Sequence, residues 1–131
     1  FVPESGLAQV GIIATGALVH KAIIAAKDLE KQGIKVKVMN LATIKPLDSE
    51  AIVSLAKEAR CIVTVEEHQI AGGMGSACAE CLGAYFPTPI EFVGVQDKFG
   101  QSGTPAELIE HYEMGVSHIL KAVEKVLKRK Q

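Results

Sequence analysis

The chain has 131 residues, a length that suits one domain with one hydrophobic core. Hydrophobic residues make up 48% and charged residues 22%, and the formal net charge is −1, so no basic surplus points to nucleic acid or to an anionic membrane surface. No apolar stretch approaches the ~20 residues that a membrane-spanning helix requires. Three cysteines, an odd number, favour reduced thiols and a cytoplasmic location.

Residues 1–8 contain a proline and a glycine, and we interpret them as a linker or the remnant of a preceding element, with the domain itself at 9–131. Because the chain starts with Phe1 rather than Met, we expect it to be part of a longer protein. Apolar periodicity then predicts alternating strands and helices. In chain order these are strand 9–14, helix 18–29, strand 35–41, helix 48–59, strand 61–66, a helix within 72–86, strand 90–95, helix 104–112 and a closing helix 116–127.

Several helix ends carry local signals. Asp48 is a credible N-cap, and Gly33 lies where a glycine commonly follows the last turn of a helix. Thr104, Pro105 and Glu107 form a capping box with proline at the first helical position. These signals locate three helix boundaries without reference to the rest of the chain.

The order of the elements indicates the fold class. Strands that alternate with helices, and that are apolar throughout, are typical of an α/β domain whose parallel sheet is covered on both faces. In such a sheet, the loops after the carboxyl ends of the strands meet at one edge, where ligands or partners bind. These loops are residues 15–16, 40–41, 66–75 and 96–104.

Gly72, Gly73 and Gly75 precede a predicted helix, whose backbone N–H groups would attract an anion. Their spacing is G-G-x-G, however, and neither the dinucleotide G-x-G-x-x-G nor the P-loop Gly-Lys-Ser/Thr is present. We therefore favour a tight turn that lets the helix pack close to the sheet.

Glu66, Glu67 and His68 follow the third predicted strand, where site residues gather and a carboxylate beside a histidine suits acid–base chemistry. Adjacent side chains of a strand point to opposite faces, so the two carboxylates are not expected to converge. Helix capping and contact with a partner or ligand both remain open, and both are favoured over direct catalysis.

Cys78 and Cys81 form a Cys-x-x-Cys, which occurs in redox and metal sites. A redox pair lies at the amino start of a helix, whereas Cys78 follows the glycines by several residues. A zinc site needs four ligands, and no second cysteine pair exists. Buried packing is the favoured interpretation.

Four stretches taken together resemble the C-terminal domain of the transketolase family: TIKPLD at 43–48, VTVEEH at 63–68, IAGGMGSA at 70–77 and DKFGQSGTPAEL at 97–108. The resemblance runs from about Gly11 to Lys128. It implies a three-layer α/β/α domain with a mostly parallel, doubly wound sheet. It also implies that the parent enzyme, one chain or two subunits, transfers two-carbon ketol groups between sugar phosphates as a homodimer.

In that family, thiamine diphosphate and magnesium are held by two other domains. The resemblance therefore implies that this chain supplies no catalytic, cofactor-binding or metal-binding residue, and that alone it is inactive. Its expected role is to pack against the remaining domains or subunit and to help assemble the dimer. Candidates for contact with a partner or ligand, all at the predicted carboxyl edge, are Glu66, Glu67, His68, Gly72, Gly73, Asp97, Phe99 and Ser102.

Related enzymes offer alternatives. 1-Deoxy-D-xylulose-5-phosphate synthase is similar in the EE–GG-x-G stretch, typically with glycine where His68 stands. The β-subunits of 2-oxo acid dehydrogenases usually have a proline-rich segment at the place of residues 99–103, and there the domain acts as a docking module. An autonomous binder of nucleotides or other small ligands is a third possibility. His68 and the Phe99–Gly103 stretch favour transketolase.

Overall fold

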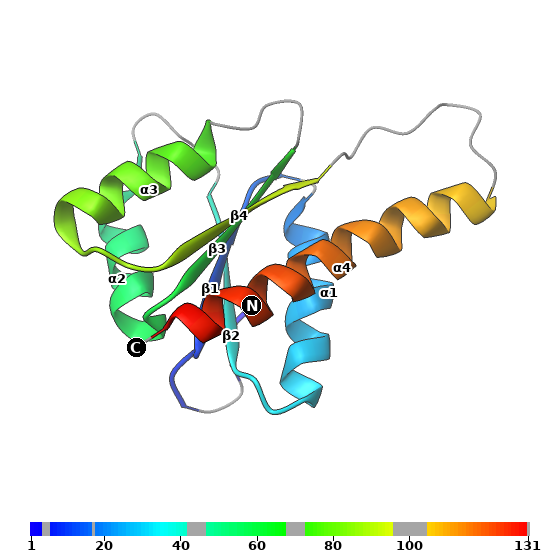
Figure 1. Ribbon diagram of the computed structural model, residues 1–131, viewed down its shortest axis with the longest axis horizontal. Coiled ribbons are helices and arrows are strands. Elements are labelled where there is room, and N and C mark those ends of the chain that lie inside the picture. The colour runs from blue at the N-terminus through cyan, green and yellow to red at the C-terminus, as the bar shows by residue number, and fades with distance from the viewer. Residues whose placement is uncertain (4–5, 17, 42–46, 68–72, 96–104, 131) are drawn as a thin grey trace.

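The computed structural model of the protein describes residues 1–3, 6–16, 18–41, 47–67, 73–95 and 105–130, with the backbone alone at 95 and 105–114 (Figure 1). The elements are β1 (Val10–Ala14), α1 (Leu18–Lys31), β2 (Val36–Asn40), α2 (Ser49–Ala59), β3 (Ile62–Glu67), α3 (Met74–Tyr85), β4 (Ile90–Val95) and α4 (Pro105–Arg129). All four predicted strands are present, each with bounds within one residue of those expected from the sequence.

The four strands form one parallel sheet in the order β2-β1-β3-β4. In the central register Ile12 pairs with Val38 of β2 on one side and with Val63 of β3 on the other. Helices α1 and α4 cover one face, while α2 and α3 cover the other (Figure 1). The three-layer, doubly wound α/β/α fold is therefore confirmed.

The two faces have separate cores. On the α1/α4 face, alternate strand residues such as Ile12 and Val63 pack with Leu18 and Ile119. On the α2/α3 face, the neighbouring strand residues Ile13 and Ile62 pack against the two helices. Both faces of every central strand are buried, which explains why these strands are apolar throughout rather than alternating.

Two of the predicted helix boundaries are confirmed by their hydrogen bonds. Asp48 Oδ1 accepts from the Ala51 N–H at 3.1 Å at the start of α2. Gly33 adopts a φ of 86°, and the Ile34 N–H donates to the Leu29 carbonyl at 2.9 Å, which closes the end of α1. Both helix boundaries depend on residues close together in the sequence, so they can be predicted without tertiary information.

The C-terminal region differs from the sequence prediction. One continuous helix, α4, spans Pro105–Arg129, whereas two successive helices were expected. Gly115 lies inside it, and a single glycine costs only about 1 kcal/mol relative to alanine in a helix. The buried side chains of Val116, Ile119 and Val123 follow it and hold the helix against the sheet. Pro105 is the first helical residue, as predicted, and Thr104 lies outside the described residues.

The amino-terminal residues contact the sheet. The Phe1 carbonyl accepts from the Val38 N–H of β2 at 2.9 Å, and the Phe1 side chain packs on the α1/α4 core. The Ala8 N–H donates to Glu58 Oε2 of α2 at 2.9 Å. The boundary between residues 1–8 and the domain stays a prediction. In the described part of the chain no helix is long and apolar enough to cross a membrane.

Candidate interface at the carboxyl edge of the sheet

The strand order creates a switch point between β1 and β3. From β1 the chain crosses to β2 on one side, whereas β3 and β4 follow on the other, so the connections diverge at the carboxyl ends of β1 and β3. The turn after β1 contains Thr15 and Gly16, where Gly16 has a φ of 52° and the Leu18 N–H donates to the Thr15 carbonyl at 3.0 Å. β3 ends here with Glu66 and Glu67.

Glu66 caps helix α3. Its Oε2 accepts from the N–H of Met74 at 2.9 Å and from that of Gly75 at 3.2 Å, and the residue is 6% exposed. A carboxylate suits the positive end of the helix dipole, and it satisfies two N–H groups that the helix itself leaves without partners. The helix-capping interpretation is confirmed, and this carboxylate serves the architecture of the domain.

The glycines allow the helix to approach the sheet closely. A Cβ on Gly75 would lie 2.9 Å from Phe92 Cδ1 and 3.2 Å from Thr64 Oγ1, so a side chain there would collide with β3 and β4. Gly73 is exposed at the N-cap position, and its carbonyl accepts from the Ala77 N–H at 3.1 Å. The close-packing interpretation is confirmed for Gly75, the glycine that the motif places inside the helix.

The two carboxylates do not converge. Glu66 lies on the α2/α3 side of β3 with its capped helix, and Glu67, the next residue of the strand, is half-buried on the opposite side. They cannot act as an acid–base pair from these positions.

The remaining carboxyl-edge candidates fall elsewhere. His68, Gly72, Asp97, Phe99 and Ser102 lie outside the described residues. Their role as contact residues, like that of Glu66, Glu67 and Gly73, therefore stays a prediction.

The Cys-x-x-Cys lies within α3, with both thiols in the core between α2 and α3. Cys78 Sγ contacts Met74 Sδ at 3.7 Å, and burial, together with the neighbouring Cys81 and Glu66, raises the pKa of Cys78 to about 12. A thiol that stays protonated is a poor nucleophile and metal ligand. The predicted packing role agrees with this environment.

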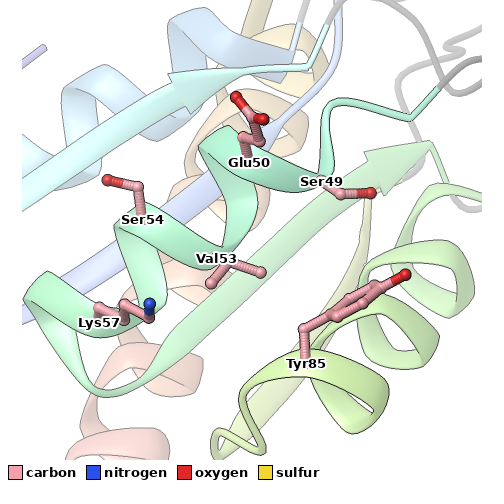
Figure 2. Close-up of a pocket in the computed structure, with 6 residues that line it drawn as sticks. All are labelled: Ser49, Glu50, Val53, Ser54, Lys57 and Tyr85. Carbon is pink, nitrogen blue, oxygen red and sulfur yellow. The ribbon is translucent and has the colours of Figure 1, made fainter.

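A hollow lined by none of the carboxyl-edge candidates is present among the described residues. It has a volume of about 640 Å³ and lies between α2 and α3, as Figure 2 shows. The side chains of Ser49, Glu50, Val53, Ser54, Lys57 and Tyr85 line it. Tyr85 projects from α3 toward α2 and is 71% exposed, so the hollow is an open surface groove (Figure 2). These residues carry no signal in the sequence, because serines and a tyrosine scattered over two helices form no recognisable motif.

The geometry thus defines an α/β domain with a four-stranded parallel sheet. At the carboxyl edge of this sheet, the Glu66 carboxylate caps helix α3. The chain belongs to the family described as "Transketolase, C-terminal domain", whose model matches residues 4–119.

The relatives include a transketolase subunit and a 1-deoxy-D-xylulose-5-phosphate synthase. The chain is 42% identical over 122 residues to the 6-deoxy-6-sulfo-D-fructose transketolase subunit SqwH of Clostridium sp. (strain MSTE9), covering 93% of this chain and 38% of that protein. It is 39% identical to 1-deoxy-D-xylulose-5-phosphate synthase of Heliobacterium modesticaldum, covering 90% of this chain and 18% of that one.

Among solved structures, the chain is similar to a split gene transketolase described as an inactive beta4 tetramer. The TM-score is 0.80 and the sequence identity 41%, with 98% of this chain and 42% of that chain covered. The chain therefore spans less than half the length of each of these three relatives.

Proposed function

We propose that this chain is the C-terminal domain of a thiamine diphosphate-dependent transketolase, an enzyme that moves two-carbon ketol units between sugar phosphates. The observation that carries the proposal is the match along 98% of the chain to less than half of a split gene transketolase. The domain's own work in this proposal is to pack against the remaining domains or subunit and to support a homodimer. The cytoplasm, where sugar phosphates are metabolised, is the proposed location.

The described residues do not fit thiamine diphosphate or magnesium. At the switch point, the amino end of α3 could receive a diphosphate, but it is already occupied by the Glu66 carboxylate. Over the described ranges, no three His, Cys, Asp or Glu side chains are grouped as metal ligands. We therefore derive no catalytic step from this chain, and we propose that the cofactor and the metal are held by the rest of the enzyme.

Activity measurements test the division of labour. The chain alone, supplied with xylulose 5-phosphate, ribose 5-phosphate, thiamine diphosphate and magnesium, is expected to give no turnover. Addition of the missing portion of the parent enzyme should produce sedoheptulose 7-phosphate. Turnover by the chain alone would contradict the proposal.

A second candidate, the C-terminal domain of a 1-deoxy-D-xylulose-5-phosphate synthase, is supported by the 39% identity to the Heliobacterium enzyme. The two candidates use different donors. The assembled enzyme would condense pyruvate with glyceraldehyde 3-phosphate and release carbon dioxide in the synthase, whereas a transketolase would accept a ketose phosphate and release none. Assay of both donor pairs on the same preparation separates them.

A further inference from the structure

A second hollow lies at the opposite, amino edge of the sheet. It has a volume of about 530 Å³ and is formed where α2 and α3 end, β4 begins and α4 ends. Its lining consists of Arg60, Phe86, Pro87, Thr88, Pro89 and Arg129. Two guanidinium groups thus share one concave surface with an aromatic ring and two prolines.

Arg60 occupies an unfavourable backbone conformation. Its φ is 69°, and it is the one non-glycine residue of the described chain with a positive φ. It follows the last turn of α2, where its N–H donates to the Ala56 carbonyl at 2.8 Å. Glycine is the usual residue at such a position because a Cβ is disfavoured there. This conformation ends helix α2, and because arginine stands where glycine is usual, the side chain is a candidate for a role of its own.

The Arg60 side chain is directed by Phe86. The guanidinium carbon lies 5.6 Å from the centroid of the Phe86 ring, and Lys57 Nζ lies 6.0 Å from the same centroid. Neither cation forms an ion pair within the part of the chain that the structure describes. Two positive charges therefore gather on one ring, and no carboxylate among the described residues pairs with either of them.

Arg129 lines the same hollow and is anchored. It donates to the Ile90 carbonyl at 2.8 Å and pairs with the Glu91 carboxylate. Lys125 lies 3.5 Å from the other oxygen of Glu91, so this one acid is shared by two cations. The hydroxyl of Thr88 donates to the Phe86 carbonyl at 2.6 Å and is used within the loop.

The helix dipole explains only part of this arrangement. A cation near the carboxyl end of a helix is favourable, which accounts for Lys57 in the last turn of α2. The dipole does not account for an arginine instead of a glycine at position 60, because Lys57 already places a positive charge at this end of α2. Arginine, by contrast, offers a planar fork that binds phosphate or carboxylate through paired N–H donors.

We propose that this amino-edge hollow binds a small molecule that joins an anionic group, phosphate-like in charge, to a flat apolar portion. Arg60 binds the anion, Arg129 adds positive charge from the other side, and the apolar portion packs on Phe86 and the two prolines. The inference does not rest on the transketolase proposal, since the hollow lies at the edge remote from the switch point.

Calorimetric titration with phenyl phosphate, inorganic phosphate and phenol tests the inference. Phenyl phosphate should bind more tightly than inorganic phosphate, and phenol should give no heat. Arg60→Gly should weaken the binding of phenyl phosphate at least tenfold, and glycine suits the backbone there, so the variant should fold. Lys31→Ala, which removes an exposed cation from the last turn of α1, is the matched control and should leave affinity unchanged.

The inference is overturned by any of three results. One is the absence of heat with phenyl phosphate at concentrations of about 10 mM, well above the range of ordinary ligand affinities. The others are an equal loss of affinity in Lys31→Ala and unchanged affinity in a folded Arg60→Gly. Transketolase turnover after addition of the missing portion of the parent enzyme tests the proposed function separately from this titration.

Discussion

The two faces of the sheet differ in how their helices pack against the strands. Among the described residues, the core of the α1/α4 face contains eighteen, mainly valine, isoleucine, leucine and alanine, and that of the α2/α3 face contains ten. The smaller face instead depends on close approach. A Cβ on Gly11 would lie 2.7 Å from Leu55 Cγ, and Gly75 is similarly enclosed. Both faces bury apolar side chains, and the α2/α3 face adds two close approaches at glycine and a buried carboxylate cap.

The largest change in the free energy of unfolding is expected for a substitution on the α1/α4 face. Ile119→Ala on α4, where the side chain is fully buried, should lower the free energy of unfolding by about 2–5 kcal/mol because it removes apolar contacts and leaves a cavity. Urea denaturation measures the change. Leu127→Ala, on the same helix but half-buried, is the control and should cost less. Equal losses would show that this face does not depend on filled volume.

Glu66→Ala tests the carboxylate cap on the smaller face. It leaves the N–H groups of Met74 and Gly75 without their acceptor in a buried place, so a loss of about 1–3 kcal/mol in the free energy of unfolding is expected. Glu66→Gln keeps an acceptor oxygen and should lose less. Glu67→Ala removes the neighbouring carboxylate on the other face of β3 and is the control. If Glu67→Ala destabilised the protein as much as Glu66→Ala, the cap would have no special weight.

Two glycines of one helix should respond with opposite signs. Gly75→Ala inserts a methyl group against Phe92 and Thr64 and should destabilise the protein by about 1–3 kcal/mol. Gly83→Ala, also in α3, meets nothing within 4 Å and should stabilise it by about 0.5–1 kcal/mol through helix propensity. Thermal unfolding of the two variants provides the comparison, and a stabilising Gly75→Ala would refute the close-approach argument.

The smallest effect concerns acid stability. The hydrogen bond from the Ala8 N–H lowers the pKa of Glu58, with Lys37 adding to the shift and partial burial opposing it. A carboxyl whose folded-state pKa is lowered contributes stability above its unfolded pKa of about 4.3, and this contribution is lost as pH falls through the lower folded value.

Glu58→Gln should therefore reduce stability at pH 7 slightly and flatten its decline between about pH 5 and pH 3. Urea midpoints across that range measure the effect. Glu124→Gln is the matched control, because Glu124 pairs only with the exposed Lys128 of its own helix within the described chain. If stability fell with pH in Glu58→Gln as it does in the unsubstituted protein, the hydrogen bond from Ala8 would not contribute to acid stability.

The end of β3 at Glu66 and Glu67 and the start of α3 after Gly73 were predictable from the sequence, because both depend on contiguous residues. The glycine-rich turn, the adjacent carboxylates and the strand before them are contiguous, so their placement at one sheet edge follows from the alternation of strands and helices. The sequence did not predict whether Glu66 caps a helix. That depends on which way its side chain points relative to the start of α3, eight residues further on.

The sequence alone determined the four strands, the cap at Asp48 and the turn at Gly33, because these depend on residues within a few positions of one another. The tertiary structure alone decided that α4 continues through Gly115, since burial of the following side chains outweighs the low helix propensity of one glycine. It also decided the left-handed backbone of Arg60 and its place over Phe86, which two helix ends distant in sequence bring together. Long-range packing selects among local conformations that differ by only about 1 kcal/mol, and a linear pattern does not contain that choice.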